Sequence, residues 1–186
     1  MRVMLCMTAV LAATLVTAIA HAGEVQSGIL VGGSIGAYST TKCGGAEDGV
    51  AVGANLCYTC RLGARPVAFL FAKNPSEDLA RVVKELDAVV AKNSSKQMAA
   101  VLNFTGEPTD DYMQKVKKFA EEAGLKHIAV TVTADADQFK VNDQAALTVM
   151  HYRNKVVKFN LAVDEAGLKD KETVAKIIKG TETILQ

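Results

Sequence analysis

The sequence PVAFLFAKNPSE at residues 66–77 decides the fold class of this chain. Residues 66–72 form a continuous apolar run, which is typical of a β-strand covered on both faces. Asn74 is a favourable helix N-cap, Pro75 suits the first helical position, and Glu77 can complete a capping box. The stretch therefore predicts a buried strand that leads directly into an amphipathic helix.

Regular patterns continue from this stretch to the end of the chain. Residues 98–104 predict a second buried strand, Thr109 a second helix cap, and the alternation over 127–133 a half-exposed strand. Residues 147–159 predict a β-hairpin, and Asp170 the cap of a last helix. A strand–helix–strand order forms a parallel crossover, and the hairpin extends the sheet in the antiparallel sense. The pattern predicts an α/β fold of three layers, a mixed sheet with helices on both faces.

The N-terminal segment has the composition of a secretory signal peptide. Arg2 precedes an uncharged run, which ends in the small-x-small pattern Ala20-His21-Ala22. We expect cleavage after residue 22 and an extracytoplasmic location, either periplasmic or secreted. The alternative is a membrane anchor, although the run is rich in Ala and Thr and no basic cluster follows it.

Charge and hydropathy exclude two classes of partner. The chain has 21 basic and 20 acidic residues, and loss of Arg2 with the signal peptide leaves a net charge of zero. A neutral chain without a basic stripe gives no support for nucleic-acid binding. No later apolar run reaches membrane length, so we expect no membrane contact after cleavage.

Residues 23–65 are rich in Gly and predict short strands joined by turns, ahead of the domain at 66–186. This segment holds all three cysteines that remain after cleavage: Cys43, Cys57 and Cys60. Two residues separate Cys57 from Cys60, a spacing that lets the sulfurs meet and cycle between dithiol and disulfide.

Four interpretations of these cysteines stay open. The pair is a redox centre, with Arg61 favouring a thiolate and Cys43 as a resolving thiol, or it is a permanent disulfide. Cys43 could also pair with Cys57 or with Cys60. Three thiolates with His127 or His151 would make a metal carrier, which we consider weak without a second Cys-x-x-Cys. No cofactor is expected, because haem attachment needs a histidine directly after Cys60.

The element order resembles the thioredoxin fold, and in particular its exported peroxiredoxin-like and disulfide-reductase-like branch. The Gly-rich residues 31–45 lie where that branch has an N-terminal hairpin. Residues 139–141, 147–149 and 153–157 are similar to the closing pattern of the branch. The resemblance implies a thioredoxin-like domain, and exchange with a protein thiol or disulfide partner.

Two family features are missing from this sequence. The resemblance implies a reactive cysteine pair at the start of the helix after residue 72, where Asn74-Pro75-Ser76-Glu77 stands instead. It also implies a cis-proline before the hairpin, where Gln144-Ala145-Ala146 stands instead. Cys57 and Cys60 precede the first core strand, so we expect them near the opposite end of the sheet. A non-enzymatic binding module with one stabilising disulfide is therefore the alternative to an exchange protein.

Overall fold

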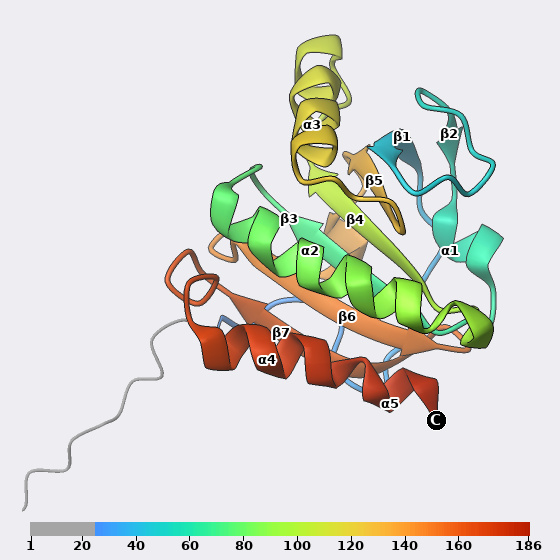
Figure 1. Cartoon of the computed structure of the whole chain (residues 1–186), viewed down its shortest axis with the longest axis vertical. Helices are drawn as coiled ribbons and strands as arrows, with labels where there is room; N and C mark the ends of the chain where they lie inside the picture. Colours follow the sequence, from blue (N-terminus) through green and yellow to red (C-terminus); the bar gives the residue numbers. More distant parts are fainter. Residues whose placement is uncertain (1–24) are drawn as a thin grey trace, which may run out of the picture.

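A seven-stranded mixed sheet forms the centre of the molecule (Figure 1). The computed structural model describes residues 25–186, so the signal peptide predicted at 1–22 lies outside the described residues. The strands lie in the order β2-β1-β5-β4-β3-β6-β7. Their bounds are β1 Thr40–Gly45, β2 Asn55–Leu56, β3 Val67–Ala72, β4 Ala99–Thr105, β5 Ile128–Thr133, β6 Leu147–Arg153 and β7 Val156–Val163.

Strand directions confirm the predicted topology. β3, β4 and β5 are parallel neighbours, with Val67 opposite Ala99 and Ala100 opposite Ile128. β6 and β7 form the predicted antiparallel hairpin beside β3. On the other side, β1 pairs antiparallel with β5, so the Gly-rich N-terminal region extends the same sheet.

Helices cover both faces of this sheet. The face that carries Leu70 and Leu102 packs against α2, α3, α4 and α5. The opposite face, which carries Phe69, packs against α1, the short helix η2 and the chain from residue 29 to 39. Helix bounds are α1 Tyr58–Leu62, α2 Glu77–Lys92, η1 Ser94–Lys96, α3 Asp110–Glu122, η2 Asp137–Phe139, α4 Lys171–Gly180 and α5 Glu182–Leu185.

Two local predictions were wrong. Ser76, not Asn74, is the N-cap of α2; its hydroxyl accepts a hydrogen bond from the amide of Leu79, and the helix begins at Glu77. Pro75 therefore precedes the cap. β5 is buried along its whole length rather than half-exposed, because β1 pairs with its outer edge and α3 packs over it. The caps at Thr109 and Asp170 are confirmed.

A buried polar side chain fixes the N-terminal segment to the sheet. The amide oxygen of Asn103 accepts hydrogen bonds from the hydroxyls of Tyr38 (2.7 Å) and Thr131 (2.8 Å). Its amide nitrogen donates to the carbonyl of Leu70 at 3.0 Å. Tyr38 also packs edge-on against Phe69, 5.4 Å between ring centroids. These contacts place residues 34–38 beside α1, where the cysteine pair lies.

His151 gives the fold a testable pH dependence. Its ring is fully buried, and Nε2 lies 3.0 Å from the carbonyl of Ile177. Burial lowers the pKa of His151 to about 4, only partly opposed by that hydrogen bond. The unfolded chain, with a histidine pKa near 6.5, therefore binds the proton more tightly, and stability falls as pH drops from about 6.5 to about 4.

We expect the fall to reach about 3 kcal/mol in unfolding free energy. Urea unfolding at several pH values across this window measures it, and His151→Gln, which cannot titrate, is the control. Subtracting the unfolding free energies of His151→Gln from those of wild type at each pH removes the contribution of the carboxylates. Equal pH slopes for both proteins would contradict the assignment.

Candidate functional site

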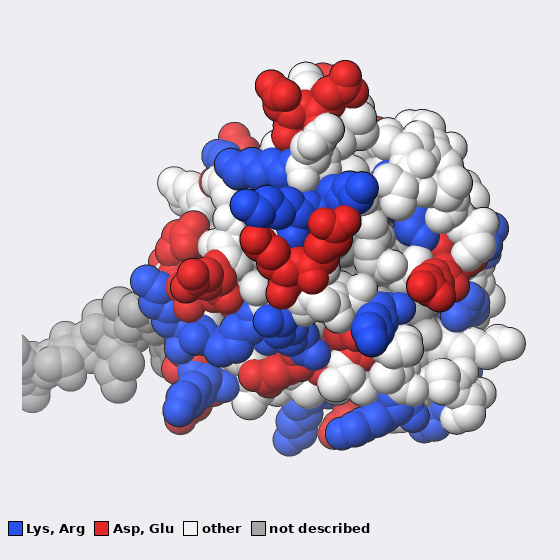
Figure 2. Space-filling view, turned by 45° about the horizontal axis from the view of Figure 1, so that its top comes forward, with Lys and Arg blue, Asp and Glu red and all other residues white. Residues whose placement is uncertain are grey.

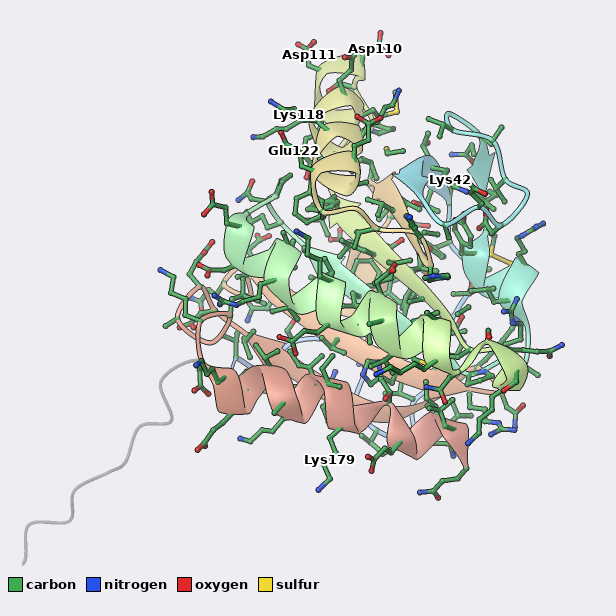
Figure 3. All side chains as sticks on the ribbon, viewed as in Figure 1. Lys42, Asp110, Asp111, Lys118, Glu122 and Lys179 are labelled. Carbon is green, nitrogen blue, oxygen red and sulfur yellow. A yellow bond between two sulfur atoms is a disulfide. The ribbon has the colours of Figure 1, made fainter. Side chains whose placement is uncertain are left out.

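Cys57 and Cys60 form a disulfide at the start of α1, with their Cα atoms 5.2 Å apart. Cys57 is the N-cap of this helix, and its sulfur accepts a hydrogen bond from the amide of Cys60 at 3.1 Å. Cys57 is half-buried, whereas Cys60 is exposed. Figure 3 shows the disulfide as a yellow bond beside α1. Cys60 is thus the more exposed residue of the pair.

Thr59, between the two cysteines, anchors the start of α1. Its hydroxyl donates to the carbonyl of Gly36 at 2.8 Å, and its oxygen lies 3.3 Å from the Cys57 sulfur. Because this hydroxyl proton is used by Gly36, a Cys57 thiol can donate to the same oxygen once the disulfide opens. The segment before β1 therefore supports the Cys57 side of the pair.

A buried lysine organises the loop that precedes the cysteine pair. The side chain of Lys42 is 3% exposed, and its ammonium donates to Asp48 Oδ1 (2.5 Å) and to the carbonyls of Ala46 (2.6 Å) and Val50 (2.9 Å). Figure 3 labels Lys42 at the β1–β2 end of the sheet. The loop at residues 46–54 thus folds around one cation.

Asp48 connects this loop to α1. Its Oδ2 accepts a hydrogen bond from the Tyr58 hydroxyl, and its carbonyl accepts one from Arg61, both at 2.7 Å. Burial alone would raise the pKa of Asp48, but its hydrogen bonds from Lys42 and Tyr58 hold that pKa below its usual value. Burial and the neighbouring Asp48 carboxylate raise the pKa of Tyr58. Arg61 is thus a structural contact of the loop.

Sequence reasoning singled out the cysteines and Arg61 but missed Lys42, Asp48 and Tyr58. One feature of the sequence could have indicated Lys42. Lys42 interrupts the otherwise uncharged stretch at residues 38–46, and a lysine that becomes buried in a strand needs oxygen partners. Its acidic partner lies only six residues further on.

Cys43 lies apart from the other two cysteines. It is 2% exposed and packs in the core on the α2–α3 face, whereas Cys57 packs on the opposite face. Burial raises the pKa of its thiol to about 11. The alternative in which Cys43 pairs with Cys57 or Cys60 is therefore not the one formed, because the sheet separates Cys43 from them and Cys57 bonds to Cys60.

The hypothetical metal site is not assembled. His151 is buried and stacks on Phe159, with 5.2 Å between ring centroids, and His127 lies at the surface. Across residues 25–186, no group of three or more His, Cys, Asp or Glu side chains could hold a metal ion.

Residues 74–77 and 144–146, which stand where the thioredoxin family has its cysteine pair and cis-proline, meet at the other end of the sheet. Lys73, Asn74 and Ser76 line a cavity of about 150 Å³ together with Gln144 and Ala145. This cavity follows the end of β3, whereas the disulfide precedes its start. The disulfide therefore lies at the end of the sheet predicted for it.

Comparisons with known proteins show the fold of this chain. No family model matches the sequence, and no curated protein matches it. Among solved structures, peroxidoxin BcpB from Mycobacterium tuberculosis is similar with a TM-score of 0.60 and 13% identity, over 83% of this chain and 97% of that one. A Chlorobium tepidum protein described as a thiol:disulfide interchange protein, DsbE, matches with a TM-score of 0.56 and 12% identity, over 81% and 99%.

A third match is a hypothetical protein from Sinorhizobium meliloti 1021, with a TM-score of 0.62 and 11% identity over 88% of this chain and 87% of that one. At these identities the likeness concerns the fold alone. The chain has a thioredoxin-like fold, as the element order predicted.

Proposed function

We propose that this protein carries out thiol–disulfide exchange through Cys57 and Cys60 after export from the cytoplasm. The observation that supports the proposal is the disulfide itself, with Cys60 exposed and Cys57 hydrogen-bonded by the Cys60 amide. Cys43, buried on the other face, takes no part in the exchange that we propose. The segment at 23–65 then supplies the redox pair, and residues 66–186 the thioredoxin-like scaffold.

The proposed reaction transfers two electrons from a partner dithiol to the protein. A partner thiolate attacks the exposed Cys60 sulfur, forms a mixed disulfide with it, and expels Cys57 as a thiolate. The amide of Cys60, already 3.1 Å from the Cys57 sulfur, stabilises this leaving group. The second thiolate of the same partner then attacks the partner's sulfur in the mixed disulfide. This forms the partner's disulfide and releases Cys60 as a thiolate. The partner leaves oxidised, and protons from its two thiols pass through solvent to Cys57 and Cys60.

Export and partner class are part of the same proposal. The signal peptide at residues 1–22 would deliver the chain to an oxidising compartment, where the pair starts as a disulfide. No helix in residues 25–186 is both long and apolar enough to cross a membrane. Acidic side chains lie among the basic ones on the face shown in Figure 2, and a chain that is neutral after cleavage gives no support for nucleic-acid binding. The proposed partner is a protein thiol or disulfide.

A second candidate function is a binding module without exchange activity. It is favoured by the contacts that join α1 to the loop at 46–54, where Tyr58 and Arg61 both bond to Asp48. In this account the disulfide only stabilises α1. Cys57→Ser would then lower stability and leave the binding of any partner unchanged.

Thiol trapping under native conditions distinguishes the two candidates. We expect dithiothreitol to reduce the Cys57–Cys60 disulfide in the folded protein, so that two thiols become accessible to an alkylating reagent. Cys43→Ser serves as the background, because it removes the buried third thiol. A disulfide that opens only when denaturant is added would favour the binding module.

A further inference from the structure

The hydroxyl of Thr59 lies between two acceptors that compete for its one hydrogen. In the disulfide form it donates to the carbonyl of Gly36 at 2.8 Å, and its oxygen lies 3.3 Å from the Cys57 sulfur. Thr59 is 0% exposed, so bulk water does not reach this hydroxyl. A hydroxyl has a single hydrogen to donate. Which acceptor receives it therefore depends on the charge of the sulfur.

The charge on the Cys57 sulfur changes during the proposed exchange. In the disulfide the sulfur is neutral and a weak acceptor, so the Gly36 carbonyl receives the hydrogen bond. When a partner thiolate attacks Cys60, the bond between the two cysteines breaks and its electron pair leaves with the Cys57 sulfur. A hydrogen bond to a charged acceptor is roughly twice as strong as one between neutral groups. The thiolate therefore attracts the Thr59 hydroxyl more strongly than the Gly36 carbonyl does.

Gly36 can lose this hydrogen bond at little cost. The residue is exposed, so water can bond to its carbonyl once the hydroxyl turns away. The surrounding segment stays attached to the sheet through the Tyr38 hydroxyl, which donates to Asn103. Rotation of the Thr59 hydroxyl about its Cβ–Oγ bond then moves the donor from oxygen to sulfur without displacing the heavy atoms.

The charged groups beside α1 bond to one another rather than to the sulfurs. Lys42 and the Tyr58 hydroxyl bond to the Asp48 carboxylate, and the Arg61 guanidinium bonds to the Asp48 carbonyl. Glu47 is exposed to solvent. Among the described residues, the amide of residue 60 and the hydroxyl of residue 59 are the two donor groups within hydrogen-bond distance of the leaving sulfur.

We propose that Thr59 is a catalytic residue of the exchange: its hydroxyl turns from Gly36 to the Cys57 sulfur and stabilises the thiolate that leaves. The inference rests on the proposed exchange function and adds a second donor to the Cys60 amide, which lies 3.1 Å from the same sulfur. The hydroxyl keeps its hydrogen throughout, and the thiolate takes its proton from solvent afterwards. Opening of the disulfide is thereby linked to release of the Gly36 carbonyl.

The pKa of the Cys57 thiol tests this role in a protein that has no other thiol. Cys43→Ser combined with Cys60→Ser leaves Cys57 as the one cysteine after residue 22, and ultraviolet absorbance of the thiolate follows its titration. We expect Thr59→Val to raise the pKa of Cys57 by about one, because hydrogen bonds to the charged form lower a thiol pKa. Thr59→Ser, which keeps the hydroxyl, should restore the lower value. Thr59→Ala gives the same comparison if the Val variant does not fold.

Thr40→Val is the matched control. Thr40 is also buried, and its hydroxyl donates to the carbonyl of Val132 at 2.9 Å, so the variant loses the same kind of hydrogen bond. Thr40 pairs with Leu56, the residue before Cys57, so the variant also tests for local loosening beside the site. It should leave the pKa of Cys57 unchanged. An equal change of that pKa in Thr40→Val and Thr59→Val would overturn the role of the Thr59 hydroxyl.

Reduction by dithiothreitol, with both cysteines in place, separates this role from the exchange function. Thr59→Val should be reduced roughly three-fold more slowly than wild type, because a thiolate of higher pKa leaves more slowly. Thr59→Ser and Thr40→Val should follow wild type. If wild type is reduced in the folded state but Thr59→Val matches it in both pKa and rate, the role of Thr59 is overturned and exchange stands. If the wild-type disulfide resists reduction in the folded protein, exchange itself is overturned.

Discussion

Cys57→Ser is expected to accumulate a stable mixed disulfide with a peptide disulfide substrate, and Cys60→Ser to accumulate roughly ten-fold less in the same time. In Cys57→Ser the remaining thiol, Cys60, is exposed and can attack, and no second cysteine within reach can release the product. In Cys60→Ser the remaining thiol is the half-buried helix cap. Both variants should lose turnover completely. Non-reducing electrophoresis with mass spectrometry of the adduct measures the two yields.

Cys43→Ser provides the reference for this experiment and should turn over like wild type. The buried Cys43 thiol, whose pKa is raised to about 11, should form no adduct in any variant. Equal yields from the two single variants, or a larger yield from Cys60→Ser, would show that exposure does not decide which sulfur is attacked.

Asp48→Ala is expected to lower the free energy of unfolding by about 3 kcal/mol, because it leaves the buried Lys42 ammonium without its counter-ion. Since the Asp48 side chain is itself 25% exposed, we expect the lower end of the range for broken buried ion pairs. The substitution also removes the partner of the Tyr58 hydroxyl and leaves Arg61 bonded to the backbone carbonyl of residue 48, so the loop at 46–54 should be held to α1 less firmly. Denaturant unfolding and amide exchange over residues 46–54 measure the two effects.

Glu47→Ala is the matched control, because Glu47 is the exposed neighbour of Asp48 and bonds to none of the described residues. It should change stability by no more than about 0.5 kcal/mol. Lys42→Met combined with Asp48→Leu removes both charges together and should recover much of the loss. A loss below about 1 kcal/mol in Asp48→Ala would mean that water replaces the carboxylate at Lys42.

The fold was largely predictable because its signals are local. The apolar run at 66–72 and the caps at Thr109 and Asp170 each depend on residues close in sequence, and the structure has all three elements. The burial of β5 depends instead on β1, which lies almost ninety residues earlier in the chain. The alternation of side chains within 127–133 does not indicate that pairing. The N-cap of α2 was misplaced because Asn74 and Ser76 are both good caps only two residues apart.

The site was predictable only in part. The spacing of Cys57 and Cys60 was enough to predict that the sulfurs meet, since a short turn suffices. The separation of Cys43 follows from strand alternation and a register shift in β1 between Lys42 and Gly44, which no pattern in the sequence indicated. A cavity of about 620 Å³ beside α1 is lined by residues from α1, β4, the segment before β5 and the loop at 46–54, and only the folded sheet brings them together.

Reduction of the disulfide in the native protein tests the central claim most directly. The oxidised Cys43→Ser protein is placed in a series of dithiothreitol redox buffers, and for each buffer the free thiols and the amide exchange of β3 and β4 are measured. The account predicts that the Cys57–Cys60 disulfide is reduced and re-formed reversibly while the amides of β3 and β4 stay protected from exchange. A disulfide that resists reduction until those amides exchange would contradict it, and would identify the bond as purely structural.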